Sequence, residues 1–300
     1  MLVVRPVTIT DDILVSSSVP ESEAVWSSGA TYGANAIVRG HTDATAHRLF
    51  ESQQAGNLNH NPTTDTGAWW VEIGPSNRWA MFDTTISTQT EAEDEIETVT
   101  APPGLVDTIS VQAVSAASLR IVQEDDDEGV VYDETFSLVS DSGITDPYAY
   151  CFEPIERLSE LTVTGLKPYA GSTVTVTLEE PGETVLCGAL IPGLSRDIGG
   201  AQYGATVGII DFTRKTRDTN GNYTVIPGAF SKRANFQVLV ENTFIDQLQN
   251  LLISLRATPT LYVGSDAYAI TTVYGYYRDF NVEIAYPTKS LCSIEIEGLI

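Results

Sequence analysis

The sequence predicts a mainly β protein built from several small units with one packed helix. Short runs that alternate apolar and polar residues recur between turn signals from residue 77 to the C-terminal end, and Val and Thr are frequent in them. One stretch, residues 242–255, instead repeats apolar residues at intervals of three and four. The 300 residues, 42% of them hydrophobic, suffice for more than one core. We expect a small aromatic-rich β module, a β-sandwich and a C-terminal β domain with one packed helix.

Residues 1–24 are predicted to form an N-terminal extension. Residues 1–6 lack an apolar core long enough for a secretory signal peptide. The sequence also has no run near the roughly 18 apolar residues of a membrane span. We therefore expect a protein made and assembled in a reducing cytoplasm, without membrane insertion.

Residues 25–76 are predicted to form the small β module because aromatic residues concentrate there. All the tryptophans and histidines lie between residues 26 and 79: Trp26, Trp69, Trp70, Trp79, His41, His47 and His60. Turn-rich stretches at 27–29 and 56–62 separate short extended pieces. The three histidines could meet around a metal, but none forms an i, i+4 pair, which favours loop histidines. We expect no metal and no cofactor.

Residues 77–186 predict the β-sandwich. Period-two alternation marks strands at 111–114, 118–122, 130–132, 161–164 and 173–178. The acidic runs 91–97 and 124–128 are interpreted as solvated loops between strands. Residues 124–128 are also the best calcium candidate, but they lack the alternating spacing and closing glutamate of an EF-hand loop, which favours the solvated loop.

Residues 187–300 predict a β domain with the helix near 242–255. Asn242 is expected to cap this helix and Pro259 to prevent a long extension. Strands are predicted at 236–240, 260–263, 271–277 and 293–297. Asn220-Gly221 predicts a hairpin turn between 211–215 and 223–226.

Charge separates the last third of the chain from the rest. The whole chain has 40 acidic and 16 basic residues, a net charge of −24, which disfavours nucleic acid as a partner. Residues 1–185 hold 30 acidic and 7 basic residues (−23), whereas 186–300 hold 10 and 9 (−1). We expect residues 187–300 to be an assembly domain that packs against copies of itself. The basic residues predicted near its docking surface are Arg214, Lys215, Arg217, Lys232 and Arg233.

The sequence contains none of the common catalytic motifs. It has no phosphate loop, dinucleotide-binding turn, zinc-protease helix or nucleophile elbow. Cys151, Cys187 and Cys292 are far apart and in no C-x-x-C spacing, so we expect buried free thiols rather than a zinc site. We predict that the protein is not an enzyme.

The aromatic-rich segment resembles the small chitin-binding-type carbohydrate-binding modules. The resemblance rests on residues 24–32, 36–38, 50–52, 61–62 and 69–74. The sequence departs from that family at Gln53-Gln54-Ala55, where those modules carry exposed tandem tryptophans. The resemblance implies that Trp26 and Trp69 hold the core and that Tyr32 and Trp70 are the candidate glycan contacts.

Two further resemblances concern the rest of the chain. Residues 77–83 and the strands that follow resemble galactose-binding-like jelly rolls. Over nearly its whole length, with residues 230–233, 262–265 and 292–299, the chain resembles tailed-bacteriophage virion proteins found among tail and baseplate genes. This implies a ring, hub or collar component in the tail of the virion, with itself and other tail or baseplate proteins as partners. The alternative is a receptor module that binds host-surface polysaccharide.

Overall fold

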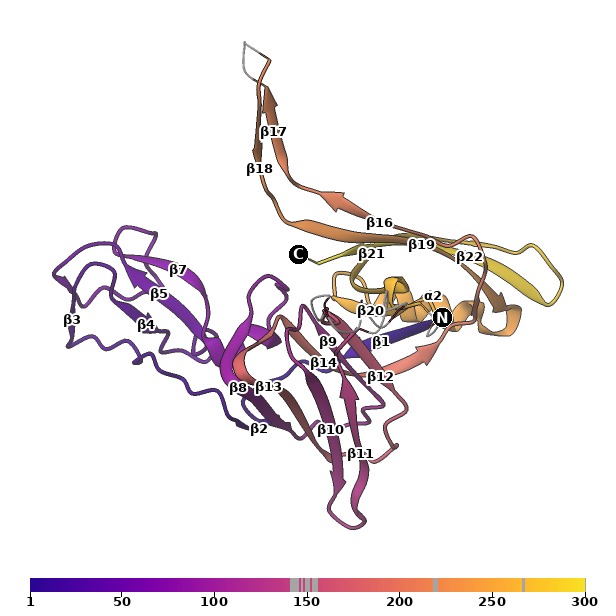
Figure 1. The fold of residues 1–300 in the computed structure, drawn as a ribbon, viewed down its shortest axis with the longest axis horizontal. Coiled ribbons are helices and arrows are strands. Elements are labelled where there is room, and N and C mark those ends of the chain that lie inside the picture. Colours follow the sequence, from indigo (N-terminus) through magenta and orange to yellow (C-terminus); the bar gives the residue numbers. More distant parts are fainter. Residues whose placement is uncertain are drawn as a thin grey trace.

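The structure is a computed structural model that describes residues 1–140, 146, 148, 152, 156–217, 221–265 and 268–299. Strands make up 52% of the residues and helices 9%, which confirms the mainly β class. The strands form a ten-stranded sheet, a five-stranded sheet, a three-stranded sheet and two small ribbons (Figure 1). Cys151 and Asn220 lie outside the described residues.

The first core is a β-sandwich. Its outer sheet has the order β11 (Gly129–Ser137), β10 (Ser118–Asp125), β13 (Thr173–Cys187), β8 (Thr90–Thr100) and β2 (Leu14–Ser17). It packs on β12 (Glu160–Thr164), β9 (Thr108–Gln112) and β14 (Ala189–Asp197) of the ten-stranded sheet. Ile109, Leu119 and Val176 are among the buried residues that fill the space between. Alternation along each strand points these side chains inward.

The acidic run 91–97 is part of strand β8, so its prediction as a loop was wrong. Thr90, Ile96 and Thr98 of this strand are buried, while Glu91, Glu93 and Glu95 are exposed. The alternation is interrupted at Asp94, which is exposed and has a φ of 64°, and the pairing with β13 shifts register there. Glu91, Glu93 and Glu95 nevertheless occupy the solvent face of the strand. Residues 124–128 form the end of β10 and the turn that follows it.

Gly188 lets the chain pass from one sheet of the sandwich to the other. It separates β13 from β14, and its N–H donates to the carbonyl oxygens of Gln112 and Ala113. A Cβ at this position would lie 2.4 Å from the carbonyl oxygen of Ile86. Only glycine fits this close approach of backbones.

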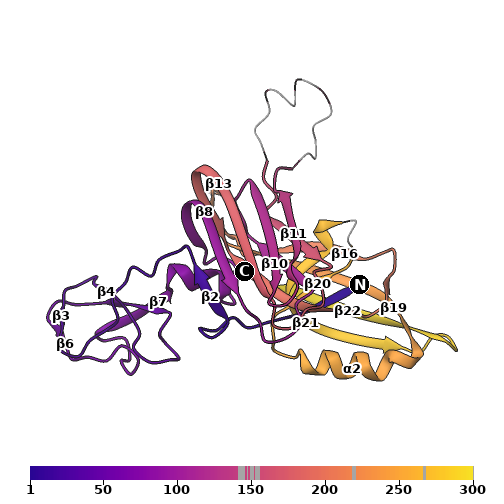
Figure 2. The ribbon, with the colours of Figure 1, turned by 90° about the horizontal axis from the view of Figure 1, so that it is seen from below.

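Beyond β14, the ten-stranded sheet curls around a second core. The order continues through β1 (Leu2–Pro6), β20 (Thr260–Val263), β21 (Thr272–Glu283), β22 (Lys289–Gly298) and β19 (Phe230–Glu241). Two short strands, β15 (Gly200–Ala201) and β16 (Thr206–Asp211), pair with β19. One helix, α2 (Ile245–Ser254), covers the sheet, as Figure 2 shows. A one-turn helix, η3 (Ala269–Thr271), precedes β21.

The predicted helix is confirmed, and its predicted cap is wrong. A 3₁₀ turn, η2 (Asn242–Phe244), leads into α2, which buries Leu248 and Leu252 against Phe236 and Tyr262. Asn242 instead donates to the carbonyl oxygen of Tyr286 and accepts from the Ser290 hydroxyl. The side chain thus ties the helix start to the β21–β22 connection rather than closing the helix end.

Strand pairing crosses two of the predicted domain boundaries. Strand β1, from the expected N-terminal extension, lies between β14 and β20 with Val3 and Val4 buried. Strands β9 and β12, from the expected sandwich domain, continue the same sheet as the strands of residues 187–300. The two large units therefore share one continuous sheet.

The aromatic-rich segment forms a separate small unit. Its sheet has the order β4 (Ile37–Arg39), β5 (Arg48–Ser52) and β7 (Trp70–Pro75), and β3 (Thr31–Tyr32) pairs with β6 (Asn57–Leu58). Val38, Phe50 and Trp70 form its core. Glu21 anchors the unit by contacts with Arg39, with His47 and with the Ser76 hydroxyl, next to η1 (Asn77–Phe82).

Candidate functional site

A two-stranded arm projects from the curled sheet. Strands β17 (Arg214–Arg217) and β18 (Tyr223–Ile226) pair only with each other, and all eight of their residues are exposed. Figure 1 shows the arm standing away from the rest of the chain. A hairpin was predicted between 211–215 and 223–226, and the structure pairs 214–217 with 223–226, while Asp211 ends strand β16. Because an isolated two-stranded ribbon is at best marginally stable in water, a second surface would stabilise it.

The arm is rooted in a defined corner. The Phe212 N–H donates to the Ala229 carbonyl, and the Thr213 N–H donates to Asp211 Oδ1. Side-chain and backbone hydrogen bonds from Thr213 hold the pKa of Asp211 below its ordinary value. A Cβ at Gly228 would lie 2.5 Å from the Phe212 carbonyl oxygen, so glycine is required there. These contacts fix the direction in which the arm leaves β16 and β19.

One face of the arm is both cationic and apolar. Lys215 lies opposite Val225, and Arg217 lies opposite Tyr223, so these four side chains share a face. The Arg217 guanidinium carbon lies 5.3 Å from the centroid of the Tyr223 ring. Tyr223 is 67% exposed, and neither strand of the arm contains an acidic residue.

The structure divides the five basic residues predicted at the docking surface. Arg214, Lys215 and Arg217 lie together on the arm. Lys232 lies at the start of β19, half-buried, and its Nζ pairs with both carboxylate oxygens of Glu160 in β12. Arg233 lies 3.7 Å from Glu295 on the neighbouring strand β22. Lys232 thus links β19 to the edge strand β12 of the same sheet, and its charge is paired within the chain.

The sequence interpretation missed the apolar part of the arm. Ile209, Phe212, Tyr223, Val225, Ile226 and Phe230 are large hydrophobic residues that the structure leaves exposed along the arm and its base. Apolar residues in a hairpin normally indicate a buried face, so the pattern alone does not reveal that both faces are free. The basic residues between these apolar residues were the only sequence feature that indicated an exposed arm.

The outer face of the five-stranded sheet is strongly acidic. Its five strands contain twelve Asp or Glu residues and a single basic residue, Arg120. Glu95, Glu97 and Glu179 lie on the outer face, whereas Glu180 has the parity of the buried Leu178 and pairs with Arg157. The Arg120 guanidinium makes two hydrogen bonds to Asp133, which lower the pKa of that carboxyl. Glu95 and Glu179 lie directly opposite each other on neighbouring strands, an arrangement that destabilises a sheet.

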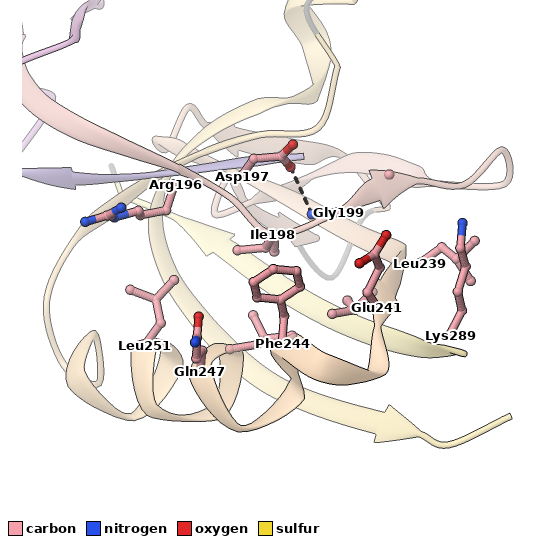
Figure 3. Close-up of a pocket in the computed structure, with 13 residues that line it drawn as sticks. Arg196, Asp197, Ile198, Gly199, Leu239, Glu241, Phe244, Gln247, Leu251 and Lys289 are labelled. Carbon is pink, nitrogen blue, oxygen red and sulfur yellow. Dashed lines mark hydrogen bonds between the residues drawn. The ribbon is translucent and has the colours of Figure 1, made fainter. Parts of the chain in front are cut away.

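A groove of about 630 Å³ lies between α2 and the end of β14 (Figure 3). The side chains of Phe244, Gln247 and Leu251 point from the helical segment into the groove, toward the chain at Arg196–Ile198. Its charged lining residues are Arg196, Asp197, Glu241 and Lys289. The groove combines an apolar floor with two basic and two acidic residues, so its formal charge is balanced.

The structure corrects the prediction for Trp70 as a glycan contact. Its ring is only 2% exposed, and its Nε1 donates to the His60 carbonyl oxygen. It offers no free face on which a sugar ring could stack. Tyr32 is half-buried, its hydroxyl accepts from the Ser27 N–H, and its ring meets Trp70 edge-on at 5.2 Å. Trp26 and Trp69 are only partly buried against this core.

Each histidine contacts a different tryptophan. His60 stacks on Trp69 at 3.8 Å between ring centroids, His47 stacks on Trp79 at 3.8 Å, and His41 lies 4.8 Å from Trp26. The rings are therefore distributed over the small module rather than gathered at one point. Within the described ranges, no three His, Cys, Asp or Glu side chains are grouped so that they could hold a metal ion.

Two of the three cysteines are buried free thiols, as predicted. Burial raises the pKa of Cys187 to about 12 and that of Cys292 to about 11. Both thiols lie in hydrophobic cores, Cys187 in the sandwich and Cys292 beneath α2. They are packing residues rather than nucleophiles.

Comparisons add no family to these observations. A scan against protein-family models gave no match, and a search of curated proteins gave no significant match either. Among the helices that the structure describes, none is long and apolar enough to cross a membrane.

Proposed function

We propose that this chain is a non-enzymatic structural component of a tailed-bacteriophage tail or baseplate, which acts by assembling with copies of itself and with neighbouring tail proteins. The observation that carries the proposal is the arm β17–β18. Its exposed residues Tyr223, Val225 and Ile226 are the kind that interfaces bury, and the arm is rooted so that it points away from its own chain. The resemblance of the sequence to tail and baseplate virion proteins supports the proposed location in the phage tail.

Assembly is tested with the full chain. We expect light scattering to give a mass that rises with concentration to that of a ring or short stack. The variant Tyr223→Ser/Val225→Ser/Ile226→Ser removes apolar surface from the arm without touching a core, and should be monomeric at the same concentration. The control Ile284→Ser/Tyr286→Ser replaces exposed residues between β21 and β22 and should assemble normally. A wild-type chain that stays monomeric at millimolar concentration would refute the proposal.

The proposed location in the tail or baseplate is tested by electron microscopy of tailed phage particles. An antibody raised against this chain, carrying a gold label, should bind the tail or baseplate. Labelling of the capsid alone, or none on particles that demonstrably contain the chain, would place the protein elsewhere. The glycan-receptor alternative keeps only Tyr32 among its predicted contacts, because Trp70 is in the core.

A further inference from the structure

The arm and the outer face of the five-stranded sheet complement each other in charge. Strand β17 brings three basic residues, and β18 has no charged residue. Lys215 has an acidic neighbour, Asp211 at the base of the arm, whose Oδ2 lies 3.9 Å from the Lys215 Nζ. The outer face of the sheet brings Glu95, Glu97 and Glu179 together, and the one basic residue of its strands, Arg120, is already paired with Asp133. Glu95 and Glu179 lie directly opposite each other, and a cation placed over them would relieve their mutual repulsion.

The two surfaces also match in spacing. Lys215 and Arg217 are two residues apart on one face of a strand, as are Glu95 and Glu97 on β8. Both pairs therefore repeat at about 6.8 Å, twice the rise of a strand residue. When β17 lies along β8 with Lys215 and Arg217 over Glu95 and Glu97, Tyr223 and Val225 lie over Thr177 and Glu179 of the neighbouring strand β13, which are directly opposite Glu97 and Glu95. Thr177 is buried and Glu179 is exposed.

The arm cannot reach this face of its own chain. In Figure 1 the arm extends from one side of the curled sheet, and the five-stranded sheet with β10 and β11 lies on the opposite side. The corner at Asp211, Phe212 and Gly228 fixes that direction. A contact between these two surfaces must therefore join two copies of the chain.

We propose that the face of the arm formed by Lys215, Arg217, Tyr223 and Val225 in one copy lies on the acidic face around Glu95, Glu97 and Glu179 of a second copy. This inference rests on the proposed function and names the surface that receives the arm. The two surfaces differ, so the contact is heterologous. Repeating it closes a ring or extends a chain of copies.

The test exchanges charges between the two surfaces of the full-length protein. One variant is Lys215→Glu/Arg217→Glu, and the other is Glu95→Lys/Glu97→Lys. Each alone should lose assembly in sedimentation velocity, with the association constant lowered at least about tenfold. An equal mixture should regain it, because each arm then meets a face of opposite charge. The control Asp279→Lys/Glu283→Lys makes the same charge change at exposed positions of β21 and should assemble like the wild type.

The outcomes separate this inference from the proposed function. Assembly that is lost in the arm variant but kept in the face variant would overturn the acidic face as the receiving surface, and would leave assembly through the arm standing. A monomeric wild type would overturn both. Circular dichroism checks that each variant folds. Should a reversal prevent folding, the milder pair Lys215→Gln/Arg217→Gln and Glu95→Gln/Glu97→Gln must each weaken assembly, and no weakening would overturn the inference.

Discussion

Asp65 organises the loop that precedes β7. Its Oδ2 accepts backbone N–H hydrogen bonds from Gly67 at 2.8 Å and from Trp69 and Trp70 at 3.1 Å. Burial raises the pKa of this carboxyl, but the hydrogen bonds from Trp70, Trp69 and Gly67 outweigh it and hold the pKa below the ordinary value. One ionised side chain thereby positions the tryptophan that fills the core of the small module.

This lowered pKa predicts how the Asp65→Asn variant depends on pH. A carboxyl with a lowered folded-state pKa contributes stability above its unfolded pKa of about 3.9, and loses it as pH falls through the folded value. We expect the variant to melt below the wild type at pH 7 and the difference to shrink toward pH 2. Thermal melting followed by tryptophan fluorescence gives the melting temperatures of the variant and the wild type at each pH. A difference that stays constant with pH would contradict the role given to the ionised carboxylate.

The sequence does not decide which of the two adjacent tryptophans fills the core of the small module. Trp70 is the first residue of β7 and is buried, whereas Trp69 precedes the strand and is only partly buried. The pairing of Ser52 with Trp70 in β5–β7 sets the register that turns Trp70 inward. Register depends on pairing with another strand, which the local sequence around Trp70 does not specify. An aromatic core was therefore predicted correctly, but with Trp69 in the place that Trp70 occupies.

At the scale of elements, the helix was the most predictable part of the chain. Leu248 and Leu252 are buried and Leu251 is partly buried, as their spacing indicates, whereas Phe244 is 52% exposed. The predicted apolar stripe begins before the α-helix does, because residues 242–244 form a 3₁₀ turn with a different period. Strand β8 was missed because residues 93–95 are all acidic and exposed, so the run shows no clear alternation of apolar and polar residues.

Substitutions in α2 test how it packs. Leu252→Ala should lower the free energy of unfolding by about 2–5 kcal/mol, because it removes buried methyl groups and leaves a cavity. Leu251→Ala should cost less, since Leu251 is only partly covered, and Gln249→Ala should change stability by less than about 0.5 kcal/mol. Urea unfolding of the full chain measures all three. Equal losses for Leu252 and Gln249 would mean that the helix does not pack through this face.

At the scale of the whole molecule, the sequence predicted strands well and their partners poorly. Most strands expected between residues 111 and 297 are present. The placement of β1 between β14 and β20 depends on pairing over nearly 200 and 260 residues, which local alternation cannot encode. The predicted division at residues 186 and 187 followed a real change in charge, but the sheet continues across it.

The central place of β1 predicts the effect of a buried charge. Val4 is fully buried, so Val4→Asp places a carboxyl without a partner between two strands, at a cost of several kcal/mol against a usual margin of about 5–15 kcal/mol. We expect the full chain to be largely unfolded by circular dichroism. Val15→Asp, at an exposed position of β2, is the matched control and should fold. A folded Val4→Asp protein would show that β1 is dispensable.

Amide hydrogen exchange of the arm is the most direct measurement of assembly through it. In a dilute monomer, the amides of residues 214–217 and 223–226 should exchange fast, because a two-stranded ribbon alone is only marginally stable. As the full chain assembles at higher concentration, we predict that these amides become protected together with those of β8, while α2 is unchanged. An arm that still exchanges fast in a sample shown by light scattering to be fully assembled would contradict the account.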